Sequence, residues 1–113
     1  MMTILKNRIE YDVNKEYDLA CSLHGSEFNS LHEAYAVLKE EQEEAKLESD
    51  VLNYECEKLW SLIKSDAESD IIEGTLENIY RKAVLGACEL VQTAAMAKKA
   101  FKNIRGKDEQ TEE

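Results

Sequence analysis

Proline is absent from this sequence of 113 residues, and glycine occurs only four times. These two residues interrupt helices most often, so their scarcity permits long continuous helices and argues against a turn-rich β fold. Glutamate, lysine, leucine and alanine, which lose little conformational freedom in a helix, dominate what remains. The composition therefore predicts an all-α fold.

The sequence also lacks any apolar run that approaches the roughly 20 residues of a membrane-spanning helix. Residues 1–10 contain no apolar core of the kind that a signal peptide carries. Cysteine is scarce, and Cys21, Cys56 and Cys88 are odd in number and widely spaced. This pattern favours free thiols in a reducing compartment over disulfides. We therefore expect a cytoplasmic protein with no membrane partner.

Positive charge is in short supply, because 14 lysines and arginines face 24 aspartates and glutamates, for a net charge of −10. Such a chain repels the phosphates of nucleic acids, so a role in binding a nucleic acid duplex is not expected. The acidic excess has two readings. It serves solubility, or it gathers carboxylates that hold a divalent cation.

Three segments carry the apolar periodicity of helices. Residues from about 7 to 23 repeat apolar side chains every three or four positions, which forms one helical stripe. Gly25 then suits a left-handed residue after a helix end. Ser30 and Glu33 have the spacing of a capping box, which predicts that a second helix begins there. Without proline or glycine to interrupt it, this helix is expected to run to about Lys64.

A third helix is predicted to begin at Asp70 or Thr75, after a short acidic loop, and to end near Arg105. A chain of this length normally organises one hydrophobic core. We therefore expect a single all-α domain over residues 1–105. Residues 106–113 are predicted to form an acidic flexible tail.

The two longer helices require more cover than the first helix can provide. Residues 83–97 of the third helix are apolar on nearly every side, and such a helix needs several neighbours. We therefore predict a long antiparallel helix pair in each chain, with two chains oligomerising into a four-helix-bundle core. The expected assembly is a homodimer or homotetramer.

Acidic side chains fall on the apolar stripe of the second helix. On a wheel of 100° per residue, Glu41 and Glu48 lie on this stripe and Glu44 flanks it. In the third helix, Glu89 is the only charged residue within 83–97. An ionised glutamate among apolar residues needs a cation, a hydrogen bond or a shifted pKa to offset its desolvation. Glu89 is therefore expected to have a partner.

If the two long helices pack antiparallel, Glu89 can face Glu41 and Glu44. Three crowded carboxylates repel one another unless a divalent ion neutralises them, and Mg²⁺ or Mn²⁺ fits an all-oxygen site. The alternative is structural: Glu89 forms a salt bridge or lies exposed in an oligomer groove. The cations considered for this salt bridge are Lys39, Lys46 and Arg81.

Two stretches of the sequence resemble a known family. Residues 28–41 (FNSLHEAYAVLKEE) are similar to the opening helix of the MazG-like nucleotide pyrophosphohydrolases, particularly the short versions of phages and their bacterial hosts. Residues 40–44 (EEQEE) match the EExxE element of that family. Residues 89–97 (ELVQTAAMA) resemble its later helix, which carries an ExxD element. With a similar first helix, the resemblance covers most of residues 13–101.

The resemblance implies an all-α fold that uses Mg²⁺ to cleave a nucleoside triphosphate into a monophosphate and pyrophosphate. It implies that Glu40, Glu41 and Glu44 bind metal or orient water, and that Glu89 completes the metal site. Gln92 stands where the family pattern has aspartate, so one ligand is lost or replaced by a neutral carbonyl oxygen. Both an enzyme and a nucleotide-binding descendant of one remain open.

The substrate-binding candidates are Gln92, Lys39 and Lys98. Positive charge for a triphosphate is expected from lysines and arginines near the acidic helices, which are Lys39, Arg81, Lys82, Lys98 and Lys99. The competing hypothesis is a non-enzymatic helical interaction protein, for example a phage factor that inhibits or sequesters a host component. The glutamine at position 92 favours this second hypothesis.

Overall fold

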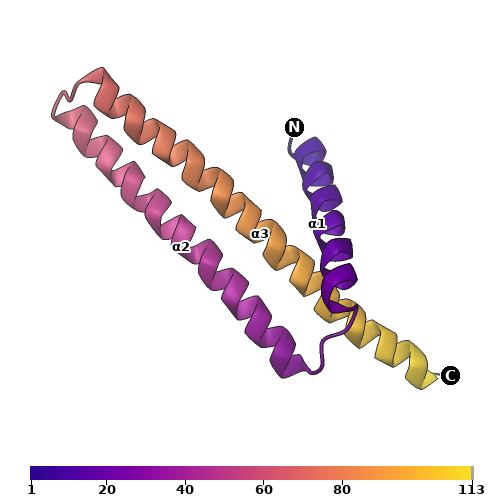
Figure 1. The fold of residues 1–113 in the computed structure, drawn as a ribbon. Coiled ribbons are helices and arrows are strands. Elements are labelled where there is room, and N and C mark those ends of the chain that lie inside the picture. The colour runs from indigo at the N-terminus through magenta and orange to yellow at the C-terminus, as the bar shows by residue number, and fades with distance from the viewer. Residues whose placement is uncertain (113) are drawn as a thin grey trace. The chain divides into compact units, whose positions relative to one another are not determined.

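The computed structural model describes the backbone of residues 1–112 and the side chains of residues 1–107. The chain forms three helices, α1 (Met2–His24), α2 (Leu31–Lys64) and α3 (Ser69–Glu112), as Figure 1 shows. No strand is present within residues 1–112. The prediction of an all-α fold is confirmed.

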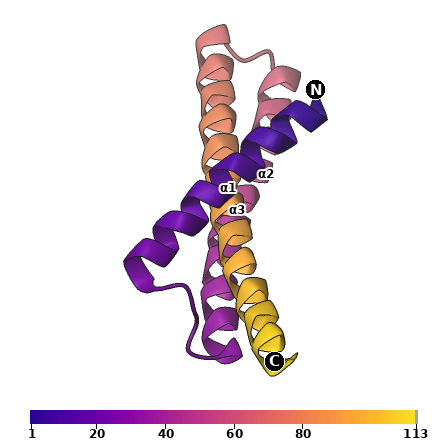
Figure 2. The ribbon, with the colours of Figure 1, turned by 90° about the vertical axis from the view of Figure 1, so that its right-hand side faces the viewer.

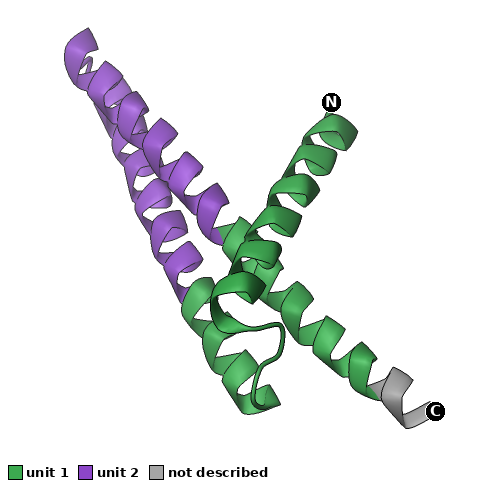
Figure 3. Cartoon of the chain, turned by 45° about the vertical axis from the view of Figure 1, so that its right-hand side comes forward, with its two compact units in different colours: residues 1–42, 90–113 green, residues 43–89 purple. Residues whose placement is uncertain are grey.

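The helices contribute to two compact units, which Figure 3 distinguishes by colour. Unit 1 contains residues 1–42 and the part of α3 from Leu90 onward. Unit 2 contains residues 43–89. The division falls inside α2 and inside α3, so each of these helices belongs to both units. The single domain expected over residues 1–105 stays a prediction.

Unit 2 is a helical hairpin. Residues 43–64 of α2 and residues 69–89 of α3 run antiparallel and side by side, which can be followed in Figures 1 and 2. Ala45 and Thr75 are buried in this hairpin. The Thr75 hydroxyl donates to the carbonyl of Ile71 at 3.2 Å, so burial does not leave it unpaired. The predicted antiparallel pair is present in this unit.

The turn of the hairpin satisfies the last carbonyls of α2. The N–H of Asp66 donates to the carbonyl of Ile63 (3.2 Å), and the N–H of Ala67 donates to that of Leu62 (3.0 Å). This pairing is a Schellman motif, with Asp66 at φ 53° in the position that glycine usually takes. Aspartate enters the left-handed region more readily than most residues. The predicted end of α2 at Lys64 is confirmed.

In unit 1, one side chain of α3 holds the segment between α1 and α2. Gly25 ends α1 at φ 85°, and its N–H donates to the carbonyl of Cys21 at 2.9 Å. Asn103 then bonds to the segment twice: its Oδ1 accepts from the N–H of Phe28 (2.8 Å), and its Nδ2 donates to the carbonyl of Ser26 (2.7 Å). The segment is therefore fixed against α3 by an amide that satisfies two backbone groups.

The start of α2 is capped by side chains. The hydroxyl of Ser30 accepts from the N–H of Glu33 at 3.1 Å, which is half of a capping box. The Glu33 carboxylate takes a different partner, because it accepts from the backbone N–H (3.3 Å) and the Nδ2 (2.8 Å) of Asn29. The predicted start of α2 is confirmed, since its first residue is Leu31.

Two predicted helix ends are wrong. Helix α1 begins at Met2 rather than near Asn7. Helix α3 continues past Arg105 to Glu112, so Gly106 does not end it. A single glycine in a helix costs only about 1 kcal/mol relative to alanine, and good helix formers follow it. Residue 113 of the predicted tail lies outside the described residues.

The fully buried hydrophobic side chains of both units are small. The buried hydrophobic residues are Ala34 and Ala95 in unit 1 and Ala45 in unit 2. Several large apolar residues are exposed: Trp60 is 59% exposed and Tyr80 is 71% exposed. Within the described chain, no helix combines the length and the apolar character that crossing a membrane requires. Self-association into a four-helix core stays a prediction.

Candidate functional site

Two of the predicted metal ligands face each other in unit 2. Glu44 of α2 and Glu89 of α3 each present a carboxylate oxygen, and these oxygens lie within 4.8 Å of one another. Glu44 is exposed, and the hydrogen bond between the two carboxyl groups raises its pKa; some desolvation and the charge of Glu89 act in the same direction. A raised pKa means that two negative charges at this position oppose each other. The folded chain therefore holds a proton on Glu44 more tightly than a free glutamate side chain does.

The other predicted acidic residues lie in unit 1. Glu41, three residues before Glu44 on α2, is half-buried and lines a cavity of that unit. Glu40 is exposed on the same helix. The EExxE sequence thus contains one side chain in a cavity, one paired across the hairpin and one exposed to solvent.

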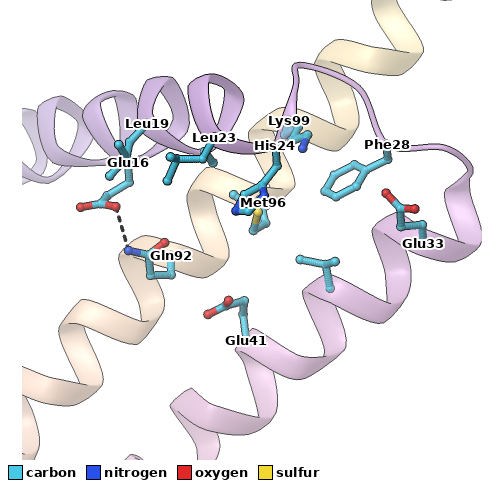
Figure 4. A pocket seen from close by; sticks show the side chains of 12 residues that line it. Glu16, Leu19, Leu23, His24, Phe28, Glu33, Glu41, Gln92, Met96 and Lys99 are labelled. Carbon is cyan, nitrogen blue, oxygen red and sulfur yellow. Dashed lines mark hydrogen bonds between the residues drawn. The ribbon is translucent and has the colours of Figure 1, made fainter.

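That cavity lies entirely within unit 1 and has a volume of about 510 Å³. Its walls combine apolar side chains with several ionisable or amide groups, shown in Figure 4. The apolar lining residues are Leu19, Ala20, Leu23, Phe28, Val37 and Met96. The polar lining residues are Glu16, His24, Glu33, Glu41, Gln92 and Lys99. This mixture and this size are typical of pockets for small organic molecules.

Gln92 has a structural partner in the cavity. Its Nε2 donates to Oε2 of Glu16 at 2.9 Å, which joins α3 to α1. An aspartate at position 92 would offer no donor and would direct a negative charge toward Glu16. The glutamine that departs from the family pattern therefore matches its neighbour in this chain.

The predicted substrate-binding lysines do not line the cavity. Lys98 donates to Oδ1 of Asn14, and its ammonium lies 4.7 Å from the centre of the Tyr17 ring. Lys39 is exposed on α2. The lysine that does line the cavity is Lys99, which is only 4% exposed.

Helical spacing groups Lys99, one of the cations considered in the sequence, with two other cavity residues. Gln92, Met96 and Lys99 are spaced by four and three residues, so they share one face of α3. All three line the cavity. The sequence alone did not reveal which face of α3 would meet α1, and for this reason Lys98 and Lys99 could not be distinguished.

The alternative to a metal site is a salt bridge from Glu89 to Lys39, Lys46 or Arg81. Two of these cations contact other residues. Lys46 forms an ion pair with Asp50 (Nζ to Oδ2 2.9 Å), and this hydrogen bond and charge raise the pKa of Lys46. Arg81 donates to Oδ1 of Asn78. In the part of the chain that the structure describes, neither cation forms a salt bridge with Glu89.

Further buried carboxylate atoms line the hairpin. Oε2 of Glu48 lies 3.5 Å from Nζ of Lys82, which is a charge contact longer than an ordinary hydrogen bond. Among the described residues, this atom and Oε2 of Glu55 are buried without a hydrogen-bond partner. The prediction that Glu48 shares the inward face of α2 agrees with this burial.

Aromatic and sulfur side chains of unit 2 contribute no further cluster. Trp60 and Tyr54 are exposed, and the Lys64 ammonium lies 5.4 Å from the centre of the Trp60 ring. Cys56 and Cys88 are exposed free thiols.

No protein-family model, curated protein or solved structure matches this chain. The resemblance to the MazG-like pyrophosphohydrolases therefore rests on the residues quoted for it.

Proposed function

We propose that this chain is a divalent-metal-dependent nucleotide pyrophosphohydrolase, or a descendant that still binds metal and nucleotide, and that it works in the cytoplasm. The observation that supports this proposal is the approach of Glu44 and Glu89 across the hairpin, with the raised pKa of Glu44. The resemblance contributes the substrate class.

The chemistry follows from the donor set. Two carboxylates in contact are destabilised when both are ionised, and a divalent cation removes that repulsion by binding between them. Mg²⁺ prefers carboxylate oxygen and keeps several waters, so two protein ligands leave positions for phosphate oxygens. Glu41, one turn before Glu44 on α2, is the third ligand that we propose, and Glu40 is the candidate for orienting the attacking water. Bound metal would supply charge neutralisation and activation of a water for hydrolysis of the triphosphate to a monophosphate and pyrophosphate.

The metal proposal is tested by thermal unfolding in EDTA, Mg²⁺ and Mn²⁺, with calorimetric titration of each ion. A metal present at about 100 times its Kd stabilises a protein by about 2.7 kcal/mol. We expect this stabilisation in the wild type and its loss in Glu44→Gln and Glu89→Gln. Glu57→Gln is the matched control, because Glu57 is exposed on α2 in the same unit. If Glu44→Gln and Glu89→Gln are still stabilised by the metal, the metal binds elsewhere.

The substrate class is tested separately by following pyrophosphate release from canonical and modified nucleoside triphosphates with Mg²⁺. Turnover that disappears in Glu44→Gln supports the enzyme. Metal-dependent nucleotide binding without turnover supports the descendant, in which Gln92 bonds to Glu16 and adds no carboxylate to the metal site. If no nucleotide binds in the presence of metal, the nucleotide part of the proposal is wrong.

A second candidate is a helical interaction protein, and the exposed apolar residues of unit 2 favour it. Side chains of this hairpin that are nearly half exposed or more include Leu47, Tyr54, Trp60, Ile63, Ile71, Leu76, Tyr80, Val84 and Leu85. Solvent-exposed apolar side chains in this number are typical of a surface that meets another protein. The partner that we propose first is a second copy of the chain, which would complete a four-helix core; a host component bound by a phage factor is the other form of this candidate.

Light scattering distinguishes these forms. A homodimer or homotetramer that dissociates on Trp60→Glu and Tyr80→Glu supports self-association. A monomer that recovers a stoichiometric protein from lysate, with recovery unchanged in Glu41→Gln/Glu44→Gln, supports the interaction protein over the enzyme.

A further inference from the structure

Lys99 is an unusual lysine because it is buried. It lies on α3 in unit 1 and is 4% exposed, and the other buried residues of the described chain are three alanines and a threonine. A buried ammonium group loses its hydration, and this loss is costly unless a negative charge or hydrogen-bond acceptors replace the water. The surroundings of Lys99 should therefore contain a counter-charge.

Within the described residues, the contact found for the Lys99 ammonium is the ring of Phe28, whose centre lies 4.4 Å from Nζ. An aromatic ring attracts a cation, but it does not neutralise its charge. Three carboxylates line the same cavity, those of Glu16, Glu33 and Glu41. Glu16 accepts from Gln92, and Glu33 accepts twice from Asn29. Among the described residues, no ion pair or hydrogen bond is found between the Lys99 ammonium and any of these carboxylates, so its direct contact is the aromatic ring.

The cavity next to Lys99 has room for a small anion. Phe28 and Lys99 lie toward one end of it, and the bonded pair of Glu16 and Gln92 lies at the other end, as Figure 4 shows. The wall between them is mostly apolar. A molecule that filled this space would meet the Lys99 cation, the Phe28 ring and the Glu33 carboxylate toward one end, and the Glu16 carboxylate at the other.

We propose that the cavity binds a small organic monoanion with a flat apolar body, whose negative group pairs with Lys99 and whose N–H or O–H donor reaches Glu16. Three carboxylates line the cavity, so a multiply charged anion such as a phosphate ester is disfavoured there. The apolar body would lie against the apolar lining residues, which include Phe28 and Met96. This binding site lies in unit 1 and shares Glu41 with the proposed metal site, so it is tested in the absence of metal and nucleotide.

The probe for this site is 6-amino-2-naphthoate, whose fluorescence changes in an apolar environment. It is titrated into the whole protein in EDTA at low ionic strength, so that metal binding cannot contribute. Two further arms use 2-naphthoate, which lacks the donor, and 2-aminonaphthalene, which lacks the anion. We expect binding to one site, with 6-amino-2-naphthoate the tightest of the three compounds.

Lys99→Met is the decisive variant. Loss of a charge-assisted contact should weaken binding of 6-amino-2-naphthoate by about tenfold or more, while 2-aminonaphthalene binds both proteins alike. The free variant should melt at the same temperature as the wild type or higher, because an uncompensated charge has been replaced by an apolar chain of similar length. Lys102→Met is the matched control on the same helix and unit, and it should bind as the wild type does.

Leu23→Trp gives a second measurement that leaves the lysine intact. Leu23 lines the cavity but is 67% exposed, so a larger ring there fills the space without disturbing the buried alanines. We expect this variant to fold and to lose the probe. Equal affinity in Lys99→Met and the wild type, or undiminished binding in Leu23→Trp, would overturn the proposal; so would the absence of binding at millimolar probe.

Discussion

Replacing Gln92 by glutamate tests whether α1 is held to α3 by the bond that the structure places between Gln92 and Glu16. The two side chains are part-buried, and Nε2 lies 2.9 Å from Oε2. Glutamate has the same shape as glutamine, so the substitution changes only the donor into a second carboxylate. Two carboxylates then approach each other where a donor and an acceptor stood.

The size of the effect follows from that geometry. A hydrogen bond to a charged group contributes about 1.5–3 kcal/mol, and partial exposure places this one near the lower end. The repulsion between the carboxylates adds to the loss, although both side chains can move apart toward solvent. We expect a decrease of about 2 kcal/mol in the free energy of unfolding. For 113 residues, 1 kcal/mol corresponds to about 4 °C, so the melting temperature should fall by about 8 °C.

Thermal and urea denaturation at pH 7 measure this decrease. The swapped double variant Glu16→Gln/Gln92→Glu restores one donor and one acceptor, and it should recover most of the lost stability. Gln42→Glu is the control, since it makes the same change of charge at an exposed position of unit 1. If Gln92→Glu and Gln42→Glu have the same melting temperature, the bond does not hold α1 in place. The same conclusion follows if the swapped double variant is no more stable than Gln92→Glu.

Two further predictions concern stability. The raised pKa of Glu44 means that the folded protein binds this proton more tightly than the unfolded chain does, so in EDTA the free energy of unfolding should fall as the pH rises from the ordinary pKa of glutamate through the raised value. Glu44→Gln should remove this part of the pH dependence in urea titrations between pH 4 and 7, and an unchanged slope would contradict the contact with Glu89. Ser30→Ala removes the side chain that caps α2 and should lower the free energy of unfolding by about 1 kcal/mol, measured by urea denaturation; Ser30→Asp, which can cap, should retain it.

The parts of the fold that local chemistry determines were predictable. The capping pattern at Ser30 located the start of α2 to within a residue, and helical spacing identified Glu44 and Glu89 as residues that would meet if α2 and α3 paired. Both inferences need only the geometry of one helix and an antiparallel neighbour. The turn at Asp66 was less visible, because the left-handed residue is an aspartate rather than the glycine that usually signals it.

The cavity of unit 1 could not be predicted, since it depends on how α1 lies against α3. Periodicity indicates that a helix has an inward face, but it does not identify which helix that face meets. Gln92 was therefore judged against a family pattern rather than against Glu16, its partner in the structure. Lys98 and Lys99 are adjacent in sequence, yet one contacts Asn14 and the other is buried beside Phe28.

Trp60 and Tyr80 carry far more apolar area than the alanines at the centre of either unit, and both point outward. Covering one large apolar side chain contributes roughly 1.5–3 kcal/mol, and the whole folding free energy of a small domain is only about 5–15 kcal/mol. A few such contacts would together contribute a free energy similar to the whole folding free energy of a small domain. The melting temperature of this chain should therefore rise with its own concentration or when a partner helix binds. This increase should be larger than for a domain whose aromatic rings are buried.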